Sequence, residues 1–176
     1  LTLTALHAPA GDLNWSPRAD VIGESFGRGL HASGVIGNVV FVAGGGYIGT
    51  SQWGSYKSAI AYDPVSDAWA VRAAMPTWRT APGSAVATYM GQQRLYVIGG
   101  TDLTEFPLWH FTHSNIEEYD PIANTWRTVG AGMPGGTYTW GTCAVVVDNL
   151  VYIMGGTNAD FSGLSDRIAA YDPDSD

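Results

Sequence analysis

Two histidines and two carboxylates stand close together in the stretch "TDLTEFPLWHFTH". His110 and His113 follow Asp102 and Glu105, and side chains of these types can ligate a transition metal. Their spacing matches no zinc or non-haem iron motif. We therefore expect hydrogen-bonding histidines here, with no bound metal and no other cofactor.

Two further features suggest catalysis at first sight. Glu117 and Glu118 are neighbours in the stretch "SNIEEYD", which reads as a strand, so their side chains should point to opposite faces and cannot act as a pair. Cys143 is the only cysteine and lies in the apolar run "GTCAVVVDNL", so we expect a small buried core residue and no internal disulfide. The sequence contains no nucleophile elbow, phosphate loop or zinc motif, and we predict no catalytic residue.

The composition limits the kinds of partner. The chain has 176 residues, 45% hydrophobic and 14% charged, which is typical of a folded protein, and its 23 glycines indicate many turns between short strands. Acidic residues outnumber basic ones 16 to 8, so a polyanion such as nucleic acid or an anionic membrane surface would be repelled. No apolar run approaches the ~20 residues of a membrane-spanning helix. The compartment stays open, with an extracellular or periplasmic location favoured over others.

Three marks recur in phase along the chain. Paired glycines end three apolar stretches at spacings of 55 and 56 residues, and Tyr-Asp-Pro recurs at spacings of 57 and 52. In the first two units a tryptophan follows the tyrosine by seven residues. The residues concerned are Gly44, Gly45, Gly99, Gly100, Gly155 and Gly156, then Tyr62, Asp63, Tyr119, Asp120, Tyr171 and Asp172, then Trp69 and Trp126.

Each unit reads as four short strands separated by turn residues. In the second unit these are "SAVATYM", "RLYVIGG", "SNIEEYD" and "NTWRTV", with "GQQ" as the first turn and "PIA" as the last. The glycine pair allows positive φ and close backbone approach, and the Asp-Pro starts a tight turn. The tryptophan has enough area to fill the space between neighbouring sheets.

The pattern "YVIGG…YDP…W" resembles the kelch repeat over almost the whole chain. Phe41, where the other units have Tyr96 and Tyr152, and the extra Gly46 are modest departures. The resemblance implies an all-β fold of kelch-type β-propeller blades, each a four-stranded antiparallel sheet. Three such units would form an incomplete ring on their own, because propellers typically have ~4–8 blades.

The ends of the chain suggest where the blades are divided. We expect residues 1–27 to supply the last strand or strands of a preceding or shared blade, led by Trp15. Blade 1 would then span 28–80, blade 2 81–138, and blade 3 139–176 without its fourth strand. Either the remaining blades belong to a longer propeller, or a second copy of the chain closes a six-bladed ring. An open arc would expose two apolar faces, so a partner is needed in both cases.

Candidate binding residues gather in the loops on one side of the predicted blades. The connections from second to third strands and those between blades should share one face, and together they hold many aromatic residues. Binding surfaces favour tyrosine, tryptophan and arginine. The candidates on this face are Trp53, Trp78, Arg79, Trp109, His110, His113 and Trp140.

Three classes of function are compatible with these features. The resemblance favours a binding module that grips a protein or a glycan. It also allows part of an enzyme, like a sugar or alcohol oxidase or a sialic-acid-processing protein, or a structural subunit of an extracellular assembly.

Overall fold

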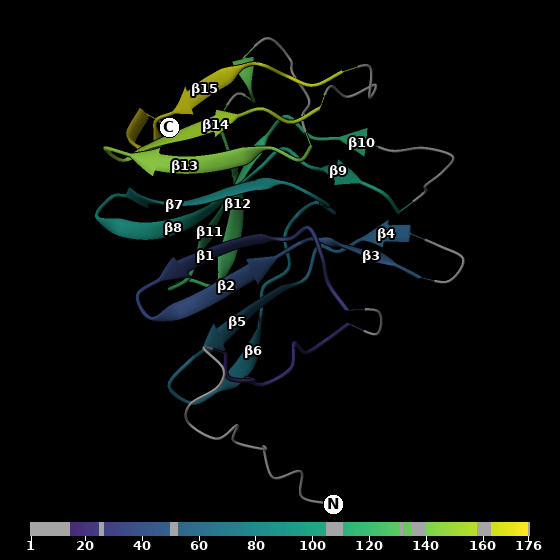
Figure 1. Ribbon diagram of the computed structural model, residues 1–176. Helices are drawn as coiled ribbons and strands as arrows, with labels where there is room; N and C mark the ends of the chain where they lie inside the picture. Colours follow the sequence, from purple (N-terminus) through teal and green to yellow (C-terminus); the bar gives the residue numbers. More distant parts are fainter. Residues whose placement is uncertain are drawn as a thin grey trace, which may run out of the picture.

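The computed structural model describes residues 15–24, 27–49, 53–104, 111–130, 132–134, 140–157 and 163–175. No α-helix occurs among them. Three antiparallel sheets stand side by side in an open arc (Figure 1). We call them blades 1, 2 and 3 in chain order, and the interfaces between them the first and second seam.

The blades have the strand order that the repeat predicted. Blade 1 has the order β1-β2-β5-β6, with β1 at Ala32–Ile36, β2 at Val39–Ala43, β5 at Ala59–Asp63 and β6 at Ala68–Arg72. Blade 2 has the order β7-β8-β11-β12, with β7 at Gly83–Tyr89, β8 at Gln92–Ile98, β11 at Ile116–Asp120 and β12 at Thr125–Val129. Blade 3 has three strands, β13 at Cys143–Val147, β14 at Leu150–Met154 and β15 at Ile168–Tyr171, followed by the 3-10 turn η2 at Pro173–Ser175.

The connections from second to third strands are more regular than expected. The chain leaves β2 through Gly44 and Gly45 and forms a second small hairpin, β3 (Gly46–Ile48) with β4 (Trp53–Ser55). Blade 2 repeats this with β9 (Thr101–Asp102) and β10 (Phe111–Thr112). Figure 1 shows both hairpins at one side of the arc, away from the short turns of the blades. We call this side the long-loop face.

The short turns follow the local chemistry of their residues. Asp63, Asp120 and Asp172 each accept a hydrogen bond at Oδ1 from a backbone N–H two residues ahead, at 2.8, 2.8 and 3.0 Å. This is the turn expected for Tyr-Asp-Pro. The turn from β7 to β8 is Met90-Gly91, both with positive φ, and β8 begins at Gln92. The predicted "GQQ" turn was therefore wrong, because its two glutamines belong to β8.

Buried side chains fill the two seams. The first seam contains Ala32, Phe41, Ala43, Ala59, Ala61, Met75, Leu95, Val97 and Tyr119, with Trp126 packed against it. The second contains Ala85, Ala87, Tyr96, Ile98, Ile116, Val129, Met133, Val151 and Ile153. Alternate residues of β8 therefore enter different seams, which makes β8 buried on both faces.

A tyrosine–tryptophan pair links blade 1, and another links blade 2, to the segment before it. Tyr119 and Trp126 are cross-strand partners with ring centres 4.9 Å apart, and the indole N–H of Trp126 donates to the carbonyl oxygen of Ala73 at 2.7 Å. Tyr62 and Trp69 pair in the same way, at 5.0 Å. The indole N–H of Trp69 donates to the carbonyl oxygen of Ala19 at 3.0 Å.

Ala19 and Ala73 thus occupy equivalent places in successive repeats. The N–H of Ala73 donates to Asn124 Oδ1 at 2.9 Å, and the N–H of Ala19 donates to Asp67 Oδ1 at 3.1 Å. Segment 15–24 therefore contacts blade 1 as the end of β6 contacts blade 2.

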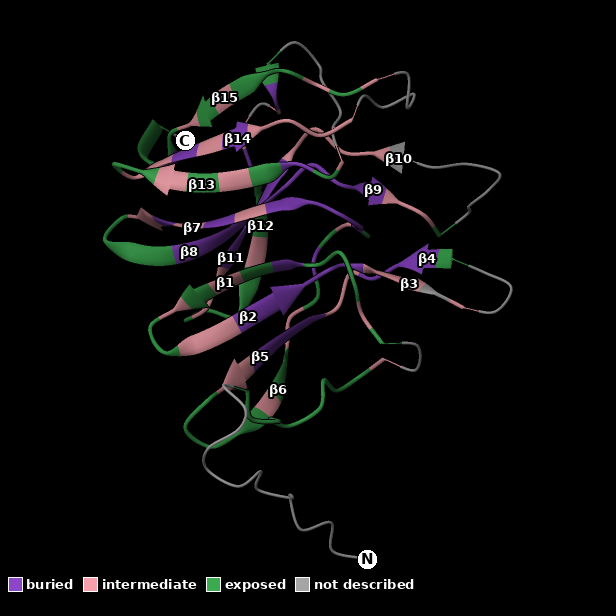
Figure 2. Cartoon of the chain, in the orientation of Figure 1, coloured by how far each residue is buried: buried purple, intermediate pink, exposed green. Residues whose placement is uncertain are grey.

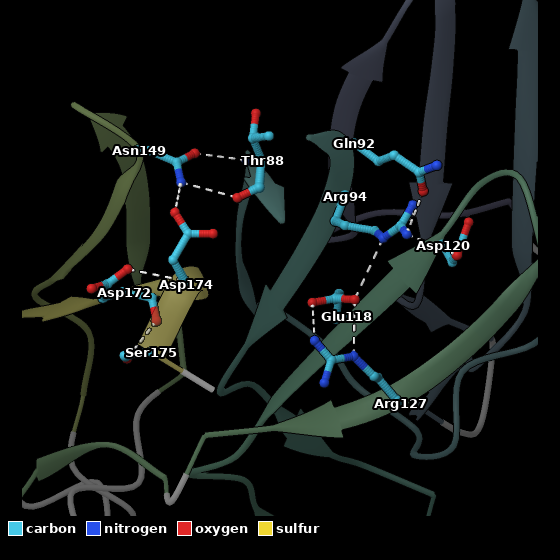
Figure 3. A network of polar contacts seen from close by, with 10 residues as sticks. All are labelled: Thr88, Gln92, Arg94, Glu118, Asp120, Arg127, Asn149, Asp172, Asp174 and Ser175. Carbon is cyan, nitrogen blue, oxygen red and sulfur yellow. Dashed lines mark hydrogen bonds and ion pairs between the residues drawn. The ribbon is translucent and has the colours of Figure 1, made fainter. Parts of the chain in front are cut away.

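Polar contacts on the short-turn side stabilise blade 2 and the second seam (Figure 3). Glu118, nearly buried, accepts two hydrogen bonds from Arg127 at 3.0 and 2.8 Å and lies 3.6 Å from Arg94 Nε. Across the second seam, the amide of Asn149 accepts from the N–H of Thr88 at 2.7 Å and donates to its carbonyl oxygen at 3.0 Å. This side chain reproduces the pair of bonds that a strand would make.

The outer face of blade 3 is apolar and uncovered. The register places Val145, Val147, Tyr152, Met154 and Ile168 on one face, opposite Val151 and Ile153. Figure 2 shows β13 and β15 largely exposed, and Val145 is 43% exposed. Cys143 lies on the same face and is exposed, so the prediction of a buried cysteine was wrong. Its strand was read correctly, but none of the described sheets covers this face.

No helix within the described residues has the length and hydropathy needed to cross a membrane.

The tryptophans of the first two repeats, Trp69 and Trp126, should differ in their effect on stability. Trp126→Ala should lower the free energy of unfolding by about 3 kcal/mol, because it leaves a cavity in the first seam and frees the carbonyl of Ala73. Trp69→Ala should cost about 1 kcal/mol, since Trp69 joins neither buried cluster of the described residues. Urea denaturation followed by circular dichroism measures both. Equal losses would contradict this assignment of the seams.

Candidate functional site

The long-loop face is organised by the paired glycines after β2. Gly44 donates its N–H to Ser58 O at 3.1 Å, and Gly45 donates to Arg79 O at 2.6 Å and accepts from Tyr56 N at 2.7 Å. A Cβ on Gly44 would lie 2.8 Å from Arg79 O, and both glycines have positive φ. Only glycine fits here, since another residue would add a clash to a strained backbone.

The backbone hydrogen bonds around the glycine pair form a frame, and the same frame recurs in the other blades. The N–H of His113 donates to Gly100 O at 2.9 Å, and that of Ser165 to Gly156 O at 2.8 Å, as Tyr56 does to Gly45. The next residues in the three blades are Lys57, Ser114 and Asp166. The backbone arrangement is therefore constant while the side chains it displays differ.

Arg79 lies inside the protein beneath this frame. Its side chain is 0% exposed and donates to Thr77 Oγ1 at 2.7 Å, to Gly99 O at 2.6 Å and to Asn115 Oδ1 at 2.8 Å. It also donates to Glu117 Oε1 at 3.1 Å, and this carboxylate is equally buried. Burial lowers the pKa of Arg79, and the charge of Glu117 opposes that shift. The guanidinium thus fixes the interblade loop to blade 2 and presents no donor to solvent.

Arg28 occupies the equivalent position in blade 1. It donates to Gly44 O, to Ser58 O at 3.1 Å and to Glu24 Oε1 at 2.9 Å. This repeated arginine was not predicted from the sequence. It stands 16 residues before its glycine, whereas Arg79 stands 20 residues before Gly99. β1 and β2 have five residues each and β7 and β8 have seven, so the four extra residues conceal the repeat.

A pocket of about 470 Å³ opens on the long-loop face of blade 1. Its aromatic walls are Tyr47, Tyr56 and Trp78, and Lys57, Ser58 and Glu24 add polar groups. The rings of Tyr47 and Tyr56 lie 5.1 Å apart, and Lys57 Nζ lies 5.3 Å from the centre of the Trp78 ring. The pocket therefore combines flat apolar surface with a cation, which is a binding chemistry.

His113 supports the far side of this pocket through Trp78. Its Nε2 lies 3.2 Å from the carbonyl oxygen of Trp78, a hydrogen bond that requires the proton on Nε2. Burial and then the positive charge of Arg79 lower the pKa of His113, so the imidazole is neutral at pH 7. It acts as a hydrogen-bond donor to the loop.

The predicted site residues have different surroundings. Trp53 and Trp78 are 47% and 39% exposed on the long-loop face, whereas Arg79 is enclosed. Trp140 lines a second pocket of about 540 Å³ with Thr157, Leu164 and Ser165 on the same face of blade 3. Trp109 and His110 lie outside the described residues. Trp15, predicted to lead a shared blade, is 85% exposed.

The two adjacent glutamates that first suggested catalysis have structural partners. Glu117 contacts Arg79 and Glu118 contacts Arg94 and Arg127, on opposite faces of β11 as their adjacency implied. No group of three His, Cys, Asp or Glu residues in the described part of the chain is placed to hold a metal ion.

Tyr47 and Tyr56 are among the loop aromatics expected on this face, but the pocket residues Lys57 and Glu24 were not singled out from the sequence. The one signal that could have found Lys57 was that the sole lysine stands two residues before the third strand of its unit.

Comparison with known proteins supports the kelch resemblance. The Kelch motif model matches residues 90–131 and 141–176. Kelch-like protein terF of Aspergillus terreus is 28% identical, over 89% of this chain and 35% of that protein. Kelch-like protein 36 of Bos taurus is 28% identical, over 100% of this chain and 26% of that protein. Kelch-like protein 38 of Rattus norvegicus is 32% identical, over 84% of this chain and 22% of that protein. The chain thus spans about a third or less of the length of these relatives.

A solved structure shares the fold. The protein in "Structure of YjhT" superposes with a TM-score of 0.60 at 20% identity, covering 82% of this chain and 37% of that one. The predicted fold class, all-β blades in an incomplete ring, is confirmed.

Removing the buried charge of Arg79 should destabilise the fold. Arg79→Ala leaves Glu117 charged and enclosed, and we expect it to lower the free energy of unfolding by about 3–5 kcal/mol. Replacing both partners, as Arg79→Met with Glu117→Leu, should recover part of that loss because no buried charge remains unpaired. Urea denaturation of the three proteins tests this. A single variant within about 1 kcal/mol of wild type would mean that the pair is solvated.

Proposed function

Because this chain belongs to the kelch-repeat family, we propose that it is a protein-interaction module that binds its partner through the long-loop face. The observation that carries the proposal is the pocket of Tyr47, Tyr56 and Trp78 with Lys57 at its side. Aromatic side chains give large contact area at small entropic cost, and they dominate the binding energy of protein interfaces.

The frame beneath the pocket favours binding without rearrangement. Met75 N donates to Lys57 O at 2.7 Å, and Arg79 N donates to Tyr56 O at 3.1 Å. The segment that carries Tyr56 and Lys57 is thus tied to the interblade loop and to the glycine turn. A pre-ordered surface loses little conformational entropy on association.

A glycan is the alternative ligand that exposed flat rings favour, since Trp53 and Trp78 can stack on a sugar as on a protein side chain. No observation in the described residues favours an enzymatic role or a structural subunit. We rank the protein partner first because the lysine adds a charge that a neutral sugar does not need.

The uncovered face of blade 3 needs a partner of another kind. We propose that further kelch-type blades extend the arc at both ends, supplied by the same polypeptide or by a second copy, with residues 1–27 acting as the last strand or strands of a preceding or shared blade. The contacts of Ala19, equivalent to those of Ala73, support this arrangement.

The binding face can be tested with a random-peptide phage library and a glycan array applied to the same protein. Selected peptides should bind Trp53→Ser and Trp78→Ser at least about tenfold more weakly than wild type. Ile122→Ser, which removes a 75% exposed apolar side chain from the short-turn side, should leave binding unchanged. If Ile122→Ser weakens binding and both tryptophan variants do not, the functional face is the other one. Glycan hits without peptide hits would replace the protein partner by a sugar.

Because the outer face of blade 3 is apolar and uncovered, we expect the isolated chain to self-associate. Sedimentation velocity should show self-association of the 176-residue protein, and Val145→Arg should reduce it, because a charge on that face opposes burial of its apolar area. A wild-type protein that stays monomeric at high concentration would show that this face needs no cover.

A further inference from the structure

We propose that the pocket of blade 1 recognises a carboxylate that is carried beside a flat apolar group, as in an acidic residue next to an aromatic or aliphatic one. This inference rests on the proposed function, because it takes the partner to be a protein and specifies what that partner inserts. It concerns the pocket lined by Tyr47, Tyr56, Lys57 and Trp78.

Three other polar side chains of the pocket, Glu24, Ser55 and Ser58, have hydrogen-bond partners within the protein. Glu24 Oε1 accepts from Arg28 at 2.9 Å and from the hydroxyl of Ser58. Ser55 Oγ lies 2.8 Å from Thr80 Oγ1 and accepts from Leu103 N at 2.8 Å. The charges of Arg28 and Glu24 therefore balance each other inside the site.

Lys57 differs from them. The ion pairs formed within the described part of the chain involve Arg28, Arg79, Arg94 and Arg127, and Lys57 takes part in none. Its ammonium rests over the face of Trp78, a cation–π contact that leaves its N–H groups available to an acceptor. The position is fixed from below by the bond from Met75 N to Lys57 O.

The charge is not a requirement of the fold. Blades 2 and 3 have the same backbone frame, and the residues equivalent to Lys57 there are Ser114 and Asp166. The cation is thus peculiar to the pocket with the aromatic walls. In a chain of net charge −8 it is a local positive spot, which discriminates an acidic group placed in the pocket from one elsewhere on the partner.

The apolar part of the ligand follows from the walls. Tyr47, Tyr56 and Trp78 surround the space next to the ammonium, and a volume of about 470 Å³ is within the range of small-ligand pockets. A carboxylate alone would leave these aromatic walls exposed to water. An aromatic or aliphatic neighbour of the acidic residue would fill it.

The test compares peptide pools and one peptide pair. A random heptapeptide phage library is selected on wild type, on Lys57→Met, which keeps a stem over Trp78, and on Lys57→Arg, which keeps the charge. Arg18→Met is the matched control, because Arg18 lies near Tyr62 and Asp67 on the short-turn side and its loss changes the net charge equally. Thermal unfolding shows whether all four proteins are equally folded.

We expect the wild-type, Lys57→Arg and Arg18→Met pools to be enriched in Asp or Glu beside an apolar residue, and the Lys57→Met pool to lose that enrichment. For the best wild-type peptide, replacing the acid by its amide should weaken binding about fivefold on wild type and not on Lys57→Met. Enrichment without acids, or an acid preference that survives in Lys57→Met, overturns this inference and leaves the proposed face intact if binding still needs Trp78. Failure of every pool to enrich overturns both.

Discussion

The hydrogen bonds of the glycine turn after each second strand are the constraint on which the long-loop face depends. In blade 1 the two peptide groups of Gly44 and Gly45 hold Tyr56, Ser58 and Arg79 by their backbones. Three segments that are distant in sequence thereby meet at one point. A Cβ on Gly44 would lie 2.8 Å from Arg79 O and one on Gly45 2.7 Å from Gly29 O, so the turn needs glycine twice. Lys57 and Trp78 of the pocket are therefore each next in sequence to a residue that this junction holds.

An arginine completes the junction from below in two blades. Arg28 and Arg79 donate to the carbonyl of the first glycine and to the segment that enters the third strand. Each is charge-balanced by a glutamate, although Glu24 comes from the preceding segment and Glu117 from the third strand itself. Two different acids therefore satisfy the same cation. The repeat thus requires a glutamate beside the arginine, but this glutamate can come from different segments.

The sequence was sufficient for the strands of the three blades because each signal was local, whereas the small hairpins β3–β4 and β9–β10 were not predicted. Glycine pairs, Asp-Pro turns and alternating apolar residues depend on their immediate neighbours, and the strand order of the blades followed from their recurrence. The contacts of Arg79 could not be read locally. Trp78 and Arg79 are adjacent and were assigned to one surface, yet Trp78 is 39% exposed and Arg79 is 0% exposed. The partners that enclose Arg79 are Gly99, Asn115 and Glu117, which come from distant parts of the chain. Likewise Cys143 was expected in a core, whereas none of the described sheets packs against its face.

The distribution of basic residues explains why the single lysine is informative. Of the eight basic residues, Arg28, Arg79, Arg94 and Arg127 hold carboxylates within the fold. A planar guanidinium suits such enclosed sites because it satisfies several acceptors at once and stays charged. An ammonium on a flexible stem is more strongly hydrated and is better suited to a contact that forms and breaks. Lys57 has that chemistry and lies over an exposed tryptophan on a rigid backbone. The fold thus uses arginine for its own cohesion, and the lysine is the cation whose chemistry suits a partner.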